Sequence, residues 1–324
     1  MNENVHPPGT GKGTGKGSIA AIVNPRSASG KTARAWAAIR PHLEATLGPV
    51  QVLETTAPQH ATQLAAAAIR AGAKTIIAVG GDGTIHEVAN GFFDRDGPLF
   101  RNAVLGIIPQ GTGSDFRRTL SIPLDAREAV DVIRRGVTRQ IDAAKVRFQT
   151  LEGTSEERYC FNITSFGVGG AVAARVNQSS KRLGGKLSFA LAAARTVPWF
   201  RGNTVRLRLD GKALPETTIT QIAVGNGQFH GGGMWMCPRA VLDDGLLDIT
   251  IIQHLSALQF LRSFPALYNG KLYEHPNVEF HRASSIDAVS NDQSLIEIDG
   301  EPVGRLPLEI SVLPKAIAVY VPGG

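Results

Sequence analysis

The chain has 324 residues, of which 43% are hydrophobic and 19% are charged, a composition typical of globular proteins that excludes wholesale disorder. At roughly 100–200 residues per domain, this length favours two domains. Cys160 and Cys237 form no CxxC pair, which argues against a disulfide framework or a cysteine-based zinc site and favours a reducing, cytoplasmic setting. Neither a run of about 18 uncharged apolar residues nor an apolar signal core is present, so we expect no spanning helix and no secretion.

The first seventeen residues are rich in Gly, Lys, Thr and Pro and lack apolar periodicity, which predicts a disordered tail over 1–17. From Ser18 onward, short apolar runs alternate with segments of helical spacing. The expected strands are 18–23, 50–55, 74–81 and 103–109, and the expected helices are 33–47, 60–72, 84–93 and 127–136. This alternation predicts an α/β domain with a parallel sheet covered by helices on both faces.

The pattern changes after about Asp142, where strand-like segments follow one another with turn residues between them. These segments are 144–148, 158–164, 204–211, 217–226, 246–252, 278–289 and 294–300. Only 180–197 and 256–270 have helical spacing. The second half is therefore predicted to be a mostly antiparallel β domain.

The segment NPRSASGKT (24–32) directly follows the first expected strand and nearly matches the phosphate loop GxxxxGK[ST]. Pro25 stands where that loop requires a glycine that lets the backbone wrap closely around phosphate. A differently shaped phosphate-contacting loop is therefore favoured over that of a P-loop NTPase. The alternative is a plain strand-to-helix turn capped by Ser29.

The segment GGDGT (80–84) lies between a strand and a helix, and Thr84 and Glu87 are spaced as a capping box. Glycine N–H groups and a helix N-terminus favour an anion there. Because Asp82 would repel bare phosphate, we expect it beside a metal ion or beside a hydroxyl awaiting deprotonation. The alternative is a left-handed turn in which Asp82 only caps the helix.

A second loop of small residues, PQGTGSDF (109–116), follows the next strand and adds another acid. Two such loops at the carboxyl ends of neighbouring parallel strands form the crevice in which nucleotides bind. GGDGT with PQGTGSDF about thirty residues later resembles the lipid kinases that include diacylglycerol kinases and sphingosine kinases, whereas NAD kinases and phosphofructokinases share only the first loop type.

The second half extends this resemblance to the second domain of bacterial diacylglycerol-kinase-like proteins. The motifs that carry it are VGNG (224–227), GGGM (231–234), Pro238, Ala240, DDGLLD (243–248), DGE (299–301) and Leu313-Pro314. In all, the resemblance covers about 18–322.

The resemblance implies an N-terminal α/β nucleotide-binding domain, similar to that of NAD kinases and phosphofructokinases, formed by 18–143 and about 314–324. It implies a mostly antiparallel β-sandwich over 144–313, with the last strand (317–322) returning to the first domain. The implied activity is transfer of the γ-phosphate of ATP, with Mg²⁺, to a lipid hydroxyl. The simplest acceptor is diacylglycerol, which would give phosphatidic acid; a sphingoid base, ceramide and phosphatidylglycerol stay open.

The same resemblance implies roles for individual residues. Those on nucleotide-binding positions are Asn24, Thr55, Gly80, Gly81, Asp82, Gly83, Thr84, Ile85, His86, Glu87, Gly111 and Thr112. Asp82 would lie beside the triphosphate and its Mg²⁺, and Glu301 would accept the hydroxyl proton, with Asp299 as the second candidate. A second Mg²⁺ site would be formed by Asp244 and the carbonyls of Val241 and Leu246, with Asp115 and Asp142 reaching the ion through water. Ser114 replaces the Asn of many relatives, with little effect expected.

These acids also have plain structural interpretations. Asp243 and Asp244 precede Gly245 and could be turn residues, and Asp142 could only begin a strand. Asp299-Gly300 suits a hairpin turn with Glu301 as its solvated flank. His86 and His230 could be general bases, but a histidine on a helix face or loop is more often only hydrogen-bonded.

Positive charge is concentrated between Arg175 and Arg208, which contains eight Lys or Arg and no Asp or Glu, although the whole chain carries only +6. Leu183, Leu187 and Leu191 recur every four residues, and Trp199-Phe200 follow. Apolar and basic groups on one helix suit the interface of an anionic bilayer, so we expect 175–208 to contact the inner membrane face peripherally. A core helix with solvated charges is the alternative.

Three functions fit these observations in decreasing order: a lipid kinase, a NAD-kinase-like enzyme with a soluble substrate, and a nucleotide-gated module that binds membranes or nucleic acid. The second does not explain the motifs GGGM, Pro238 and DDGLLD over 231–248, and the third gives the clustered acids no function. No RRM, zinc-finger or helix-turn-helix signature is present, so no nucleic-acid partner is expected.

Overall fold

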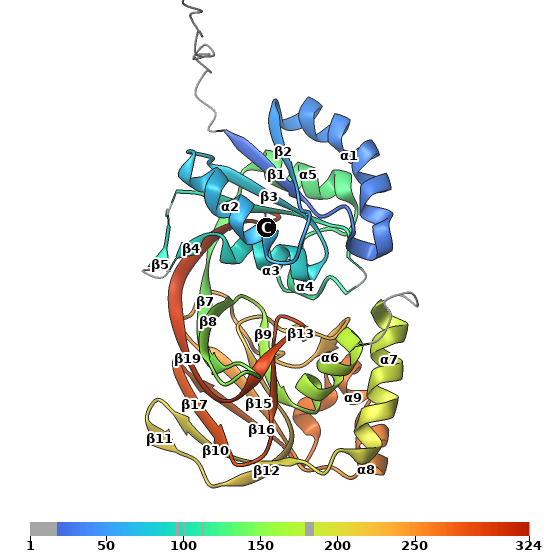
Figure 1. The fold of residues 1–324 in the computed structure, drawn as a ribbon, viewed down its shortest axis with the longest axis vertical. Helices are drawn as coiled ribbons and strands as arrows, with labels where there is room; N and C mark the ends of the chain where they lie inside the picture. Colours follow the sequence, from blue (N-terminus) through green and yellow to red (C-terminus); the bar gives the residue numbers. More distant parts are fainter. Residues whose placement is uncertain (1–17, 95–96, 100–101, 112, 179–184, 324) are drawn as a thin grey trace, which may run out of the picture.

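The computed structural model describes residues 18–94, 97–99, 102–111, 113–178 and 185–323. The predictions made for the tail 1–17, for Thr112 and for 179–184 lie outside the described residues. The described chain forms two domains, one above the other along the long axis (Figure 1). Among the described residues, no helix combines the length and the apolar character needed to cross a bilayer.

The first domain is built on four parallel strands in the order β6-β3-β1-β2. These are β1 (Ile19–Val23), β2 (Val50–Glu54), β3 (Thr75–Gly80) and β6 (Val104–Pro109). All six residues of β3 are buried, because helices cover both faces of a parallel sheet. A short hairpin, β4 (Phe93–Asp94) with β5 (Gly97–Pro98), lies outside this sheet.

The helices of this domain form two pairs. They are α1 (Lys31–Leu47), α2 (His60–Arg70), α3 (Asp82–Asn90), α4 (Asp115–Thr119) and α5 (Ala126–Arg135). α1 packs against α5, and α2 packs against α3. Because crossover connections between parallel strands are right-handed, the order β3-β1-β2 places α1 and α2 on opposite faces of the sheet.

Two long antiparallel strands connect the domains: β7 (Thr138–Gln149) and β19 (Glu301–Tyr320) pair along most of their length (Figure 1). The end of β19 also pairs in parallel with β6, at Ala318 and Val319, so the chain's last strand lies in the first domain's sheet. The pairing is irregular between Leu313 and Ile317, where Lys315 has a φ of 50°.

The second domain consists of antiparallel strands around a separate core that includes Phe148, Phe166, Leu207 and Ile222. Its strands are β8 (Ser155–Cys160), β9 (Ile163–Gly167), β10 (Asn203–Leu209), β11 (Lys212–Ala213), β12 (Thr217–Gly225), β13 (Phe229–His230), β14 (Met234–Trp235), β15 (Leu247–Gln253), β16 (Val278–Ala283), β17 (Ser285–Ser290) and β18 (Leu295–Ile298). The burial of β10 alternates strictly, which is the pattern of a strand with one face on the core.

Helices lie on one side of this domain. They are α6 (Val168–Gln178), α7 (Gly185–Thr196), α8 (Ala257–Ser263) and α9 (Ala266–Asn269), with 3-10 turns η3 (Val197–Trp199) and η4 (Lys271–Glu274). α6 was not predicted, because its first residues, VGGA, lack the apolar spacing of a helix and contain two glycines. α7, α8 and α9 match the predicted helical segments where these are described.

The predicted capping box of α3 is wrong, and so is the alternative in which Ser29 caps α1. α3 begins at Asp82 after Gly81, so Thr84 and Glu87 lie inside the helix and form no capping box. The Thr84 hydroxyl instead accepts a hydrogen bond from Asn24 Nδ2 (3.0 Å). α1 begins after Gly30 with no side-chain cap, so Ser29 does not cap it.

Candidate active site

The two glycine-rich loops contact each other at the carboxyl ends of β3 and β6. A Cβ added at Gly111 would lie 2.5 Å from the Cα of Gly81, and one added at Gly80 would lie 2.6 Å from the side chain of Thr84. Side chains at these positions would therefore collide with backbone or with a buried threonine. Glycine is required because the loops pack back to back.

Asp82, the acid of GGDGT, joins the two loops through its carboxylate. It accepts hydrogen bonds from the backbone N–H groups of Ser114 (2.6 Å) and Asp115 (2.9 Å) at the start of α4. Burial and the neighbouring charge of Asp115 nevertheless raise the pKa of Asp82 from 3.8 to about 6. The ionised form of Asp82 is therefore destabilised, and a cation bound beside it would stabilise that form.

Asp115 lies next to Asp82 and reaches the second domain. Its Oδ2 accepts a hydrogen bond from the N–H of Gly232 (2.7 Å), whereas its buried Oδ1 has no hydrogen-bond partner among the described residues and lies 3.9 Å from Arg118 Nε. Two adjacent carboxylates, of which Asp115 is buried and has an unsatisfied oxygen, fit Mg²⁺, which binds one or two carboxylates together with substrate phosphates. No group of three or more metal-binding side chains occurs within the described part of the chain.

The remaining residues predicted to bind the nucleotide surround the same loops. Asn24 at the end of β1 bonds Thr84, and Thr55 is buried just after β2. The carboxylate of Glu87 accepts a hydrogen bond from the N–H of Ala61 (3.1 Å), which places it at the N-terminus of α2 rather than in the crevice. Burial raises the pKa of Glu87.

The loop after β1 adopts an unusual backbone. Ala28, Ser29 and Gly30 are all left-handed, with φ values of 50°, 58° and 83°. Two successive non-glycine residues in this region cost of order 1 kcal/mol each or more, and such strain concentrates at ligand-binding loops. This loop is not a turn with a serine cap, because no side chain caps α1.

Asp299 is the most heavily bonded carboxylate in the described structure. It accepts hydrogen bonds from His86 Nδ1 (2.8 Å), Cys160 Sγ (3.1 Å) and the N–H groups of Phe161, Asn162 and Ile163 (2.9–3.1 Å). Burial alone would raise the pKa of Asp299, but these donors outweigh it and hold the pKa below its usual range. Asp299 is therefore a weak base.

His86 is the partner of Asp299 from the first domain. Burial would lower the pKa of His86, but the hydrogen bond and charge of Asp299 outweigh burial and raise it. The two side chains form a buried ion pair between α3 and the turn after β18. This pair connects the GGDGT helix directly to the Asp-Gly-Glu turn.

Glu301 lies beside the GGDGT loop and, unlike Asp299, is not surrounded by hydrogen-bond donors. A Cβ added at Gly83 would lie 3.3 Å from Glu301 Oε1, so the carboxylate rests against that glycine. Its other oxygen is 3.7 Å from Arg158 Nη1, and about a third of the side chain is exposed. Glu301 thus combines access to solvent with proximity to the first domain.

The residues predicted for a second Mg²⁺ site are brought together only in part. Asp142 accepts hydrogen bonds from the N–H groups of Gly245 and Lys315 (both 2.7 Å), so it holds the loop over 241–246 against the irregular part of β19. Asp244 pairs with Arg282 and accepts the N–H of Leu246, while Val241 is exposed. Asp115 is bonded to Gly232 in the cavity between the domains.

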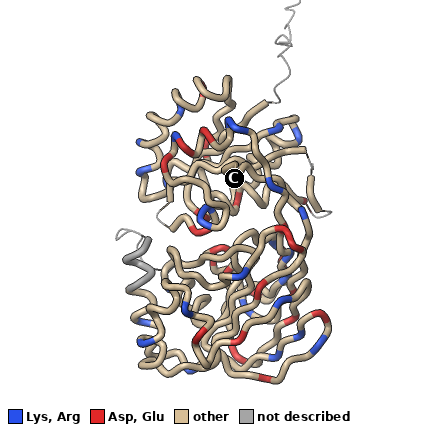
Figure 2. Tube along the Cα trace, turned by 180° about the vertical axis from the view of Figure 1, so that it is seen from behind, with Lys and Arg blue, Asp and Glu red and all other residues tan. Residues whose placement is uncertain are grey.

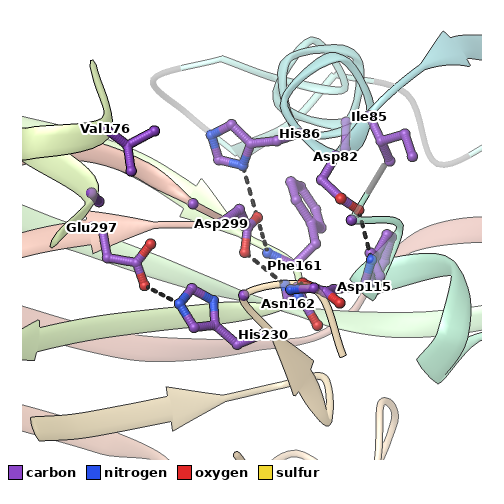
Figure 3. A pocket seen from close by; sticks show the side chains of 17 residues that line it. Asp82, Ile85, His86, Asp115, Phe161, Asn162, Val176, His230, Glu297 and Asp299 are labelled. Atoms are coloured by element: carbon purple, nitrogen blue, oxygen red, sulfur yellow. Dashed lines mark hydrogen bonds and ion pairs between the residues drawn. The ribbon is translucent and has the colours of Figure 1, made fainter. Parts of the chain in front are cut away.

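A cavity of about 210 Å³ lies between the domains and joins these groups (Figure 3). Asp and Glu residues occur on both sides of the domain junction (Figure 2). The cavity is lined by Asp82, Ile85, His86, Ala89, Gly113, Asp115, Phe116, Phe161, Asn162, Ala173, Val176, His230, Gly231, Gly232, Glu297, Asp299 and Gly300. The sequence analysis named neither Asn162 nor Glu297 as a site residue. Glu297 lies two residues before Asp299, and residues two apart on a strand share a face, so this spacing could have indicated it.

Residues 18–146 match the diacylglycerol kinase catalytic domain family, and residues 162–321 match the YegS C-terminal NAD kinase beta sandwich-like domain. "Diacylglycerol kinase" of Mycobacterium tuberculosis (strain ATCC 25618 / H37Rv) is 30% identical over 308 residues, which cover 94% of this chain and 96% of that protein. The chain belongs to the diacylglycerol kinase family. It is therefore a lipid kinase, a phosphotransferase with the two-domain architecture of this family.

Other similarities agree with this family. "Probable lipid kinase YegS-like" of Xanthomonas axonopodis pv. citri (strain 306) is 28% identical over 258 residues, 79% of this chain and 81% of that protein. The crystal structure of a candidate diacylglycerol kinase from Bacillus anthracis str. Sterne has a TM-score of 0.75 at 26% identity, covering 95% of this chain and 99% of that one.

Yeast NADH kinase, solved with NADH, shares the fold alone, with a TM-score of 0.56 at 14% identity, over 95% of this chain and 84% of that one. The predicted fold class, an α/β domain of NAD-kinase type followed by a β-sandwich-like domain, is confirmed.

Proposed function

We propose that this lipid kinase transfers the γ-phosphate of ATP to the hydroxyl of diacylglycerol and forms phosphatidic acid. The observation that carries the proposal is that Glu301 of the second domain rests against Gly83 of the GGDGT loop. An acid from one domain thereby lies beside the anion-binding loop of the other, and its neighbour in sequence, Gly300, lines a cavity with both polar and apolar walls. Relatives named diacylglycerol kinase support the choice of acceptor.

ATP would bind at the carboxyl ends of β1, β3 and β6. The N-terminus of α3 and the glycine N–H groups of 80–83 favour the phosphates, and Asn24, Thr55, Gly111 and Thr112 would complete the nucleotide site. Asp82 and Asp115 would hold Mg²⁺, which when bound offsets negative charge on the phosphate oxygens. With that charge offset, the raised pKa of Asp82 would return toward its usual value.

The acceptor hydroxyl would enter from the second domain and lose its proton to Glu301. A lipid hydroxyl is a poor nucleophile, so a positioned carboxylate that accepts its proton accelerates attack on the γ-phosphate. Asp299 is unsuited to this role because its oxygens already accept five hydrogen bonds. We assign Asp299 and His86 the task of holding α3 and the Asp-Gly-Glu turn at a fixed separation.

A second Mg²⁺ at Asp244, with the carbonyls of Val241 and Leu246 and with water bridges to Asp115 and Asp142, stays a prediction. Asp142 already accepts two backbone N–H groups, and Asp244 pairs with Arg282. Binding of an ion there would require Asp244 to exchange Arg282 for the cation. Its role would be to hold the loop over 241–246, distant from the transferred phosphate.

We further propose that the chain meets its lipid at the cytoplasmic face of a membrane. Within 175–208, Trp199 is 83% exposed and Leu191 is exposed on α7, with Arg195 and Arg201 nearby in sequence. α8 contacts η3 and adds the exposed side chains of Leu258 and Leu261. Exposed aromatic and apolar groups among arginines suit the interface of an anionic bilayer.

The test of the proton acceptor compares two variants in transfer of labelled phosphate from ATP to diacylglycerol in mixed micelles. Glu301→Gln is expected to lower kcat at least 100-fold while KM for ATP and thermal stability stay near wild type. Asp299→Asn is expected to lower stability by about 3 kcal/mol, because it breaks a buried ion pair.

Glu309→Gln is the matched control, since it makes the same change at an exposed carboxylate of the same strand, β19, which pairs with Arg147 at the surface. It should leave both kcat and stability unchanged. A Glu301→Gln enzyme with near wild-type kcat would show that this residue is not the proton acceptor.

A further inference from the structure

Arg158 on β8 places a positive charge beside the proposed proton acceptor, and the proposed phosphoryl transfer does not use it. Its Nη1 is 3.7 Å from Glu301 Oε2, and its Nη2 is 3.6 Å from the carboxylate of Glu156. Both distances exceed that of a hydrogen bond, and the guanidinium forms no hydrogen bond within the described part of the chain. Its N–H groups are therefore available to an anion.

The strand that carries Arg158 determines where it points. Residues two apart on a strand share a face, so Arg158 lies on the same side of β8 as Cys160. The thiol of Cys160 donates to Asp299 (3.1 Å), which lies two residues before Glu301. The contacts Cys160–Asp299 and Arg158–Glu301 therefore follow each other along the two segments with the same spacing.

Tyr159, the residue between them, attaches this part of β8 to the first domain. The side chain of Asn90, the last residue of α3, donates to the Tyr159 carbonyl (2.9 Å) and accepts from its N–H (3.0 Å). The ring of Tyr159 stacks on Phe93, with ring centroids 4.1 Å apart. Because α3 begins at Asp82, these contacts hold Arg158 at a defined place relative to the GGDGT loop.

Negative charge leaves Glu301 during the proposed transfer. The acceptor oxygen forms a bond to the γ-phosphorus, the bond from that phosphorus to the bridging oxygen breaks with its electron pair staying on ADP, and the hydroxyl proton moves to Glu301. Glu301 becomes neutral, and the new phosphate ester is negatively charged. A guanidinium beside Glu301 thus loses its anionic partner as a phosphate forms next to it, and arginine binds phosphate strongly through paired N–H groups.

We propose that Arg158 is a phosphate-binding residue of the second domain, which pairs with Glu301 before the transfer and with the transferred phosphate once Glu301 has taken up the proton. The inference rests on the lipid-kinase activity and on the role of Glu301 proposed above. No Lys or Arg occurs among the described residues that line the cavity, so Arg158 would supply a positive charge that this wall lacks. An interaction made only as the phosphate transfers raises kcat and leaves KM for ATP unchanged.

The first test measures kcat and KM for transfer of labelled phosphate from ATP to dioleoylglycerol in mixed micelles, with thermal unfolding of each variant. Arg158→Gln should lower kcat about tenfold or more and leave KM for ATP and the melting temperature near wild type. Arg158→Lys keeps the charge without the paired donors and should recover part of the lost kcat. The matched control is Arg147→Gln, at an exposed arginine of the neighbouring strand β7 that pairs with Glu157 and Glu309, and it should leave kcat unchanged.

The second test needs no turnover and measures binding of dioctanoyl-phosphatidic acid, a short-chain form of the product, by titration calorimetry. Glu301→Gln imitates the neutral, protonated acid, so it frees Arg158 and should bind this lipid about tenfold more tightly than wild type. Adding Arg158→Gln to Glu301→Gln should abolish most of that gain, because the guanidinium that binds the phosphate is then absent.

A folded Arg158→Gln enzyme with wild-type kcat would overturn the inference and leave the lipid-kinase proposal intact. The same conclusion would follow from a Glu301→Gln protein that binds the product no more tightly than wild type, whether or not the Arg158 variants fold. A gain in binding that survives the loss of Arg158 would also overturn it. A wild type that phosphorylates no lipid would contradict the proposed function instead.

Discussion

Asp82 is a carboxylate that folding places where its negative charge is costly. Burial and the nearby Asp115 favour its protonated form, although two backbone N–H groups bond it. A group whose folded pKa is raised binds more protons in the folded than in the unfolded state between the two pKa values. Stability therefore falls as pH rises from about 3.8 to above 6.

The fall in stability with rising pH leads to a prediction for Asp82→Asn in the absence of nucleotide and metal. The variant lacks the titrating group, so its free energy of unfolding relative to wild type should rise by about 1 kcal/mol between pH 5 and pH 7.5. Urea unfolding at the two pH values measures it. A stability difference that stays constant, or that falls with rising pH, would show that the charge of Asp82 is not penalised.

The sequence singled out acids that the structure brings close to the two glycine-rich loops, but it did not report the contacts that distinguish these acids. GGDGT and Asp-Gly-Glu stand out as motifs, so Asp82, Asp299 and Glu301 were all singled out. The difference between Asp299 and Glu301 depends on hydrogen bonds that residues 160–163 donate to Asp299, and these residues are more than a hundred positions away in sequence. No local pattern reports that Asp299 is saturated with hydrogen bonds and that Glu301 is not.

At the scale of elements, the apolar periodicity predicted the four parallel strands of the first domain to within one or two residues, because β1, β3 and β6 are buried on both faces, but it missed the short hairpin of β4 and β5. Helix ends were less predictable. α3 begins three residues earlier than its capping-box pattern indicates, since the side chains of Thr84 and Glu87 bond to tertiary partners, Asn24 and Ala61. α6 was missed because glycines replace the apolar spacing at its start.

The helical side of the second domain provides the element-scale prediction. Trp199 on η3 and Leu261 on α8 are 83% and 69% exposed, so replacing both with Ser removes apolar surface without opening the core. This double variant should bind anionic phosphatidylglycerol-containing vesicles at least tenfold more weakly in sedimentation, because the interface loses two apolar anchors.

The control is Leu151→Ser, at an equally exposed leucine in the turn between β7 and β8 of the same domain. It should sediment with vesicles as the wild type does. Undiminished vesicle binding by the Trp199 and Leu261 double variant would remove this surface as the membrane contact.

At the scale of the whole molecule, the site exists because two strands connect the domains. β7 and β19 run from one sheet into the other, and the His86–Asp299 pair connects the domains again across the cavity. The sequence indicated two domains, and its resemblance to lipid kinases implied that acids of both, Asp82 and Glu301, take part in the reaction. The cavity wall of Glu297 and His230 depends on how β13 and β18 meet in space, which no sequence spacing reports.

We propose that acids of both domains act together in the transfer of phosphate from ATP to diacylglycerol. The direct measurement is incubation of wild type and Asp82→Asn with γ-labelled ATP, a panel of lipids and NAD, with Mg²⁺ or with chelator. We expect labelled phosphatidic acid from wild type with Mg²⁺, and none with chelator or with Asp82→Asn. Labelled NAD with no labelled lipid, or labelling that survives loss of Asp82, would contradict it.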